Sequence, residues 1–401
     1  MPELWSGLLP HPWNLVAVSL VAAGLVFAFI GLSTFLAIWA ERKVSGRIQD
    51  RLGPTRVGPY GLLQSLADGI KLITKEDFAP DEADRFLFRF APYLAFCASF
   101  CGFLALPFGA GLVAIELEIA AFFMLAVLSS EVFGIILAGW ASASKWALFG
   151  GLREAAQVVS YEVPRAMCVV VPVCVAGTLR LTEFGRQQAG GFWNWYVFHD
   201  PFTFLAFFIF FITSTASCKR APFDLAEAES ELVSGFLVEY SGIRWSYFFL
   251  AEYGSMFAVS GLAVFLFLGG WHSGLPHAEL TDSLGFWAGN AINMALFIAK
   301  CWVLVLVMIW LRWSLPRLRI DQVMTTCLRY LLPISCVLLV GVCLWQLLMP
   351  AQVGRLVSSG LAVLTVAVML GVVVSLFRSP KTPRGMVSGS WAGRPSPVSP
   401  R

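Results

Sequence analysis

The chain has 401 residues, of which 58% are hydrophobic and only 13% are charged, and its mean hydropathy is +0.75. This composition excludes an ordinary soluble domain and is typical of a multispanning membrane protein. The formal net charge is only +3, spread over several connections, so the charge indicates no nucleic-acid partner.

Nine apolar stretches are each long enough to cross about 30 Å of hydrocarbon as a helix of about 20 residues. Each is one continuous block and not a set of short alternating strands, so we predict an all-α bundle of about nine transmembrane helices. No basic residue precedes the first stretch, so we interpret it as a retained span and not as a signal peptide. The stretches are residues 15–40, 88–109, 118–139, 155–179, 198–217, 246–270, 284–311, 330–349 and 356–377.

The distribution of basic residues predicts the orientation. Of the 28 Lys and Arg residues, 23 fall in alternate connections or in the C-terminal tail, and Arg180, Arg186 and Arg355 are the basic residues on the opposite side. Loops rich in Lys and Arg stay in the cytoplasm. We therefore expect the N-terminus outside and the C-terminus in the cytoplasm, which also favours an odd number of spans.

The first cytoplasmic connection begins with a charged collar, residues 41–60. Arg42, Arg47 and Arg51 recur at helical spacing in it, and two Gly-Pro pairs then predict turns. Simple anchoring at the cytoplasmic face explains any one of these cations equally well. Residues 61–76 follow with helical apolar periodicity, which predicts an amphipathic helix in the interface plane with Asp68 among apolar neighbours.

The connection of residues 218–245 carries four carboxylates within eight residues. Asp224, Glu227 and Glu231 are spaced to share one face of a helix opened by Pro222, with Glu229 on another face. Crowded acids raise one another's proton affinity when they are buried. The alternative is a solvated helix whose acids favour the helix dipole.

Ionisable residues also fall inside the predicted spans or at their ends: Glu131, Glu162 with Arg165, Glu252 and Lys300. Such residues usually belong to ion or proton routes, because charge in hydrocarbon is costly. A simple helical pair between Glu162 and Arg165 is the alternative for those two.

The cysteines and histidines predict no redox centre in this chain. None of the nine cysteines forms a CxxC pair, and the four histidines fall at or beyond the outer ends of spans. Iron–sulfur clusters and haems need Cys or His ligands in suitable groupings. We therefore expect the chain itself to bind no metal and no cofactor.

The chain carries several long motifs, namely Glu41-Arg-Lys, Arg51-Leu-Gly-Pro-Thr-Arg-Val-Gly-Pro-Tyr60, Ser160-Tyr-Glu162, Arg220-Ala-Pro-Phe-Asp224, Ala251-Glu-Tyr253 and Pro316-Arg-Leu-Arg-Ile-Asp-Gln322. Together these motifs closely resemble the H subunit of bacterial NADH-quinone oxidoreductase, the counterpart of subunit 1 of mitochondrial respiratory complex I. The likeness covers roughly residues 15–350.

The resemblance implies a subunit of a proton-translocating NADH:quinone oxidoreductase in the bacterial inner membrane that is not catalytic alone. Residues 1–350 would form an eight-helix domain whose loops 42–89 and 218–245 build a quinone chamber with peripheral-arm subunits. Those partners would carry FMN and iron–sulfur clusters, and small membrane subunits would lie alongside. The implied quinone-binding residues are Arg42, Arg51, Asp68, Phe223 and Asp224. The implied proton-path residues are Glu131, Glu162, Glu227, Glu229, Glu231, Glu252 and Arg153.

Three features depart from the family pattern. Ser217 stands where the family usually has an acid, and Lys219 adds charge nearby. Glu154 is an unfamiliar acid that would compensate for the missing one. Residues 351–378 form an additional predicted transmembrane helix, followed by a basic tail at 379–401 whose composition predicts disorder.

Two other functions remain open from the sequence. One is the related membrane subunit of an energy-converting hydrogenase, which handles no quinone. The other is an independent ion or solute carrier, against which the absence of visible internal repeats speaks.

Overall fold

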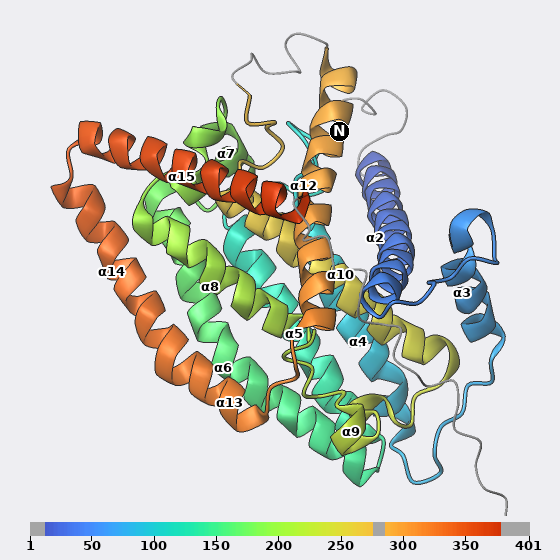
Figure 1. Cartoon of the computed structure of the whole chain (residues 1–401). Helices are drawn as coiled ribbons and strands as arrows, with labels where there is room; N and C mark the ends of the chain where they lie inside the picture. Colours follow the sequence, from blue (N-terminus) through green and yellow to red (C-terminus); the bar gives the residue numbers. More distant parts are fainter. Residues whose placement is uncertain (1–12, 276–284, 378–401) are drawn as a thin grey trace, which may run out of the picture.

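The computed structural model describes residues 13–275 and 285–377, and these form a helical bundle (Figure 1). No β-strand occurs in this part of the chain, and the predicted all-α class is confirmed. The predicted tail at 379–401 lies outside the described residues. The longer helices are α2 (Trp13–Ile48), α3 (Gln64–Thr74), α4 (Arg85–Leu104), α5 (Ala120–Ala141), α6 (Lys145–Ala176), α8 (Pro201–Ser217), α10 (Gly242–Phe267), α12 (Phe286–Ser314), α14 (Leu332–Leu348) and α15 (Ala351–Phe377).

Short helices fill the connections at the two ends of the bundle. At one end lie α7 (Leu181–Gln187) and the 3-10 turns η2 (Phe192–Asn194) and η3 (Tyr196–Phe198). At the other end lie α9 (Glu229–Leu232), η4 (Gly235–Leu237) and α13 (Ile320–Thr325). A π-helical turn (Thr326–Leu331) joins α13 to α14. The turn η1 (Pro59–Gly61) precedes α3.

Each of the nine predicted spans overlaps a helix in the described part of the chain. Among the described residues, seven helical stretches are long and apolar enough to cross a membrane, while Pro201–Ser217 and Leu356–Val368 are shorter apolar stretches. The chain is therefore a multi-pass membrane helix bundle. The count of nine spans and the orientation of the termini stay predictions.

Helix α10 forms the centre of the bundle. It is apolar around most of its circumference and is the most buried of the span-length helices. Such a helix must be surrounded by others. Small residues allow this close packing, since a Cβ added at Gly254 would lie 2.6 Å from Ser99 Oγ, and one at Gly261 would lie 2.8 Å from a methyl carbon of Leu106.

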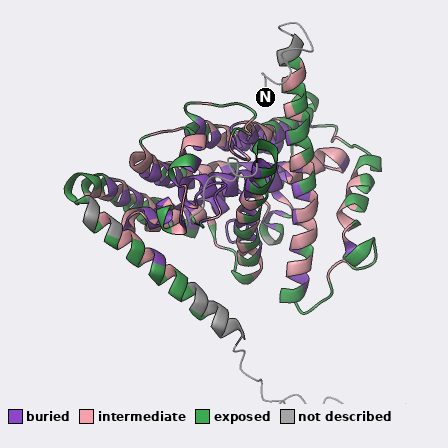
Figure 2. Cartoon of the chain, turned by 90° about the horizontal axis from the view of Figure 1, so that it is seen from above, coloured by how far each residue is buried: buried purple, intermediate pink, exposed green. Residues whose placement is uncertain are grey.

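The outer helices bury fewer of their apolar side chains. Leu20 and Leu25 of α2, Val303 of α12 and Val337 of α14 are exposed. Figure 2 shows buried residues gathered in the middle of the bundle and exposed ones on the peripheral helices. In a soluble protein the outer surface carries mostly polar side chains, whereas here the outer helices expose apolar side chains. Such a surface is suited to contact with lipid chains.

Helix α3 confirms the amphipathic helix predicted for residues 61–76. It lies beside α2 at the edge of the bundle (Figure 1) and has no buried residue. The apolar side chains of Leu66, Ile70 and Ile73 are exposed. A helix with one apolar face and no protein to cover it is suited to the membrane interface.

Helix α15 does not return along α14. After Met349 and Pro350 the chain turns, and α15 runs crosswise to α14 near the end of the bundle that carries α7 (Figure 1). It contacts η2 and η3, and Ser358 Oγ donates a hydrogen bond to Trp193 O. Its sequence satisfies the length of a span, but within this isolated chain its axis lies crosswise to the spans.

The segment after α8 differs from its prediction. The sequence predicts a helix opened by Pro222 with Asp224, Glu227 and Glu231 on one face, whereas residues 221–228 form turns and only Glu229–Leu232 are helical. Phe223 and Leu225 pack in one apolar cluster and Ala226 in another. Because these neighbouring side chains pack into two separate clusters, the backbone follows an irregular path and not a helix. The three acids therefore do not share a helix face.

Candidate functional site

Two adjacent cations, Lys219 and Arg220, lie buried directly after α8 and connect its end to the helices around it. Lys219 has a left-handed backbone conformation (φ 53°). The two side chains form ion pairs with different carboxylates, and each cation is the centre of a separate charged cluster. We name them the Arg220 cluster and the Lys219 cluster.

The Arg220 cluster joins α2, α10 and α12. Arg220 forms ion pairs with Glu41 (2.8 Å) and Glu252 (2.7 Å), and its guanidinium lies 4.2 Å from the centre of the Tyr253 ring. Glu41 also pairs with Arg312 at 2.6 Å and accepts a hydrogen bond from Tyr253 Oη at 2.6 Å. Buried ions are tolerated only when paired and hydrogen-bonded in this way.

The Lys219 cluster lies between α5 and α10. The Lys219 ammonium pairs with Glu131, and Ser255 Oγ donates a hydrogen bond to the other Glu131 oxygen at 2.5 Å. Burial would lower the pKa of Lys219, but the carboxylates of Glu131 and Glu154 hold this pKa above its ordinary value. Lys219 therefore stays protonated at neutral pH.

Glu162 and Arg165 form the pair one helical turn apart that the sequence left open as an alternative, with an N–O distance of 2.7 Å. Arg165 is almost fully buried and also donates a hydrogen bond to Ser217 Oγ at the end of α8. Ser129 Oγ donates to Glu162 at 2.5 Å. Ser217, at the position where the resemblance implies an acid, is thus a hydroxyl that accepts a hydrogen bond from an arginine.

The predicted residues of the 218–245 loop divide into a buried and an exposed group. Phe223 is buried, and Asp224 pairs with Arg317 at 2.9 Å while its other oxygen has no hydrogen-bond partner among the described residues. Burial raises the pKa of Glu227, and the neighbouring carboxylates Glu252 and Asp224 raise it further.

The acids at the start of α9 lie at the surface. Glu229 is exposed, and Glu231 pairs with Arg153 of α6 at 2.5 Å with half of its side chain in contact with solvent. The structure therefore brings Glu131, Glu227 and Glu252 toward one buried region, and it leaves Glu229 and Glu231 outside that region.

The predicted collar residues lie at the same edge as α3. Arg42, near the end of α2, pairs with Asp68 of α3, and Gln64 donates a hydrogen bond to the other Asp68 oxygen at 3.1 Å. Arg51 is exposed, and its Nε donates to Gln49 at 2.6 Å. The Arg42–Asp68 pair links α2 to α3, and the Asp68 carboxylate is partly exposed as well as paired.

Sequence reasoning missed the central role of Glu41, Arg220 and Arg312. The sequence places these residues in membrane-flanking loops, and nothing in their local surroundings signals that they meet. The one signal in the sequence was their position at the ends of apolar helices: Glu41 follows the apolar part of α2, and Arg220 comes shortly after α8. A charge at such a junction needs a partner.

Lys300 does not have the position expected for an ion route. Its ammonium donates hydrogen bonds to three carbonyl oxygens that follow α10, those of Leu268 (2.6 Å), Gly270 (3.1 Å) and His272 (2.6 Å). It also lies 4.2 Å from the centre of the Trp195 ring. Lys300 thus satisfies the carbonyl end of a helix.

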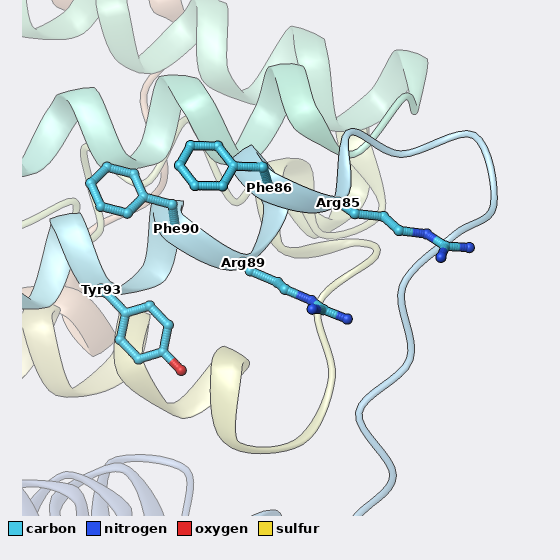
Figure 3. A pocket seen from close by; sticks show the side chains of 5 residues that line it. All are labelled: Arg85, Phe86, Arg89, Phe90 and Tyr93. Atoms are coloured by element: carbon cyan, nitrogen blue, oxygen red, sulfur yellow. The ribbon is translucent and has the colours of Figure 1, made fainter.

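A surface pocket of about 410 Å³ lies on the first turns of α4, away from both clusters. Figure 3 shows Arg85 and Arg89 extending to one side of the helix, with Phe86, Phe90 and Tyr93 along it. Arginine beside aromatic rings is the ordinary composition of a membrane-interface belt. The pocket therefore has the composition of such a belt, and no residue of the two charged clusters lines it.

Comparison with known proteins gives a consistent result. The family model described as NADH dehydrogenase matches residues 21–343. The H subunit of NADH-quinone oxidoreductase from Anaeromyxobacter dehalogenans is 44% identical over 353 residues, which cover 86% of this chain and 85% of the relative. The H subunit from Chlorobium luteolum is 43% identical over 84% of this chain and 92% of the relative, and that from Dehalococcoides mccartyi is 40% identical over 92% and 97%.

Proposed function

Because the chain belongs to the family of the NADH-quinone oxidoreductase H subunits, we propose that it lines the quinone-binding chamber of the complex and couples quinone reduction to proton translocation. It is a complex I membrane subunit and is not catalytic alone. The comparisons name NADH-quinone oxidoreductases, so the hydrogenase-type and carrier alternatives have no observation in their favour.

The observation that carries the coupling proposal is the pair of buried clusters around Lys219 and Arg220. Together they join α2, α5, α10 and α12 through ion pairs. Two-electron reduction of a quinone creates a demand for two protons, and charge interactions are strong where water is excluded. A change of charge beside Asp224 or Glu227 would therefore alter the pairing of these buried groups.

The chamber proposal rests on residues in two places, the edge formed by α2 and α3 and the loop after α8. Arg42 and Asp68 form a polar pair between α2 and α3, where a headgroup would pass from the bilayer, and Arg51 adds an exposed guanidinium nearby. Phe223 and Asp224 would face the chamber from the loop after α8. An aromatic ring and a carboxylate there would position a quinone ring and its oxygens.

The partner proposal rests on apolar side chains exposed in the collar. Leu52 is 87% exposed and Tyr60 is 82% exposed, although both lie in a charged loop outside the apolar helices. Such residues become buried when a hydrophilic partner docks. We propose peripheral-arm subunits as those partners, with FMN and iron–sulfur clusters bound by them and none bound by this chain, in a bacterial inner membrane.

The test uses the purified complex and a photoreactive short-chain quinone. We expect light to label peptides that contain residues 42–68 and 218–224, and excess unlabelled quinone to prevent the labelling. Phe223→Ala should raise the KM for quinone, with NADH oxidation by ferricyanide unchanged. Labelling confined to other subunits, together with an unchanged KM in Phe223→Ala, would overturn the chamber proposal.

A further inference from the structure

Glu154 is a buried acid that the proposed function leaves unused. It lies in the third turn of α6, is 0% exposed, and neither of its carboxylate oxygens has a hydrogen-bond partner among the described residues. Its neighbour Arg153 points instead to the surface pair with Glu231. A fully buried carboxylate without a partner is costly as an anion, so it needs a physical explanation.

Contacts between α6 and the end of α8 set the position of Glu154. Gln157, one turn further along α6, donates a hydrogen bond from Nε2 to Ala216 O at 2.9 Å. This contact places the face of α6 that carries Glu154 beside the residues that follow Ala216. Lys219 is the cation whose charge acts most strongly on Glu154, and the carboxylates that act on it are Glu131, Asp224 and Glu252.

Lys219 therefore lies within electrostatic range of two buried carboxylates and is ion-paired with one of them. Its ammonium contacts Glu131, which Ser255 also supports with a hydrogen bond. One buried cation stabilises one buried anion, and a second anion next to Glu131 would be repelled. The arrangement with the fewest unpaired charges has an ionised Glu131 and a protonated Glu154.

We propose that Glu154 is a proton-carrying residue of this subunit and that Lys219 alternates between Glu131 and Glu154 as the proton moves. In the first state Glu154 holds the proton and Lys219 pairs with the Glu131 carboxylate. In the second state the proton is on Glu131 and Lys219 pairs with the Glu154 carboxylate. One O–H bond breaks and one forms, no electron moves, and the summed charge of the three groups stays zero.

This alternation has a structural advantage over transfer to an isolated acid. The net charge buried between α5, α6 and α8 does not change, so the transfer requires no new solvation of an ion. The inference rests on the proposed function, because quinone reduction supplies the change in charge that would favour one state over the other.

The test compares three variants in the assembled, purified complex reconstituted in liposomes. Glu154→Gln keeps the shape but cannot carry a proton, Glu154→Asp keeps the carboxyl group, and Glu118→Gln removes a solvent-exposed carboxylate as a matched control. Three quantities are measured: ferricyanide reduction by NADH, proton translocation per NADH oxidised with a short-chain ubiquinone, and the infrared difference spectrum on quinone reduction.

We expect Glu154→Gln to reduce ferricyanide normally and to lose quinone-coupled proton translocation by about 10²-fold, the lower end of the range for removal of an acid–base group. A carboxylic C=O band in the infrared difference spectrum should disappear in Glu154→Gln and persist, shifted, in Glu154→Asp. Glu118→Gln should match the wild type in every measurement.

The inference is overturned if Glu154→Gln translocates protons and retains the infrared band like the wild type. If the wild-type complex itself fails to couple quinone reduction to proton translocation, the proposed function fails instead, so the two failures are distinguishable. If Glu154→Gln does not assemble, Glu154→Ala provides the same comparison, because it removes the unpartnered carboxylate altogether. Normal coupling in Glu154→Ala would also overturn the inference.

Discussion

Replacement of Arg220 by Met should destabilise the subunit strongly, and the structure sets the size of the effect. Arg220 is the guanidinium at 2.7 Å from Glu252, whereas Glu41 keeps Arg312 and Tyr253 when Arg220 is removed. The change therefore leaves one buried carboxylate without its arginine. Breaking one partner of a buried pair costs about 3–5 kcal/mol, or roughly two to four orders of magnitude in the unfolding equilibrium.

A double-mutant cycle separates the stranded charge from lost packing. Arg220→Met combined with Glu252→Gln removes the unpaired carboxylate, and we expect the double variant to recover at least about 2 kcal/mol of the loss. The measurement is the free energy of unfolding of the detergent-solubilised protein in a denaturant series. Arg186→Met, at an exposed position, is the control and should change stability by less than about 0.5 kcal/mol. A loss below about 1 kcal/mol for Arg220→Met, or further loss on adding Glu252→Gln, would refute the reasoning.

Three further predictions follow from single residues. Lys300→Met should lower the thermal midpoint by the equivalent of about 2–4 kcal/mol, because three carbonyl oxygens lose a charged donor, without changing proton translocation per NADH in the molecules that remain folded. Gly235→Ala should abolish assembly on native gels, since Gly235 has φ 55° and an added Cβ would overlap the Ala226 carbonyl oxygen. The folded protein raises the pKa of Glu227, so this residue contributes stability that is greatest below the ordinary glutamate pKa of about 4.3 and is lost as the pH rises through the folded-state pKa. Glu227→Gln should therefore be more stable than the wild type at neutral pH. The denaturant midpoints of the two proteins, measured across pH, should converge in acid.

The helices and the charged collar could be predicted because their signals are local. A run of about 20 apolar residues specifies a spanning helix without reference to the rest of the chain. The amphipathic period of residues 61–76 specified α3 in the same way. The pair of Glu162 and Arg165 was also within reach, since one helical turn separates them.

The central clusters could not be predicted because their contacts are distant in sequence. Glu41 and Arg220 are 179 residues apart and Glu41 and Arg312 are 271 apart. Helical spacing of the acids after Pro222 suggested one shared face, but burial of Phe223, Leu225 and Ala226 in separate apolar clusters decides the backbone path. Helix propensity is a weak preference that tertiary packing overrides.

The adjacency of Lys219 and Arg220 limits how this subunit can be recombined with its relatives. A single peptide segment delivers two cations whose carboxylates reside on three other helices, α2, α5 and α10. A chimera that imports this loop alone would combine foreign cations with resident acids. Exchange of this loop between relatives should therefore give a folded subunit only when residues 217–220 are transferred together with Glu41, Glu131, Glu154 and Glu252. These residues form one unit although they are distant in the sequence.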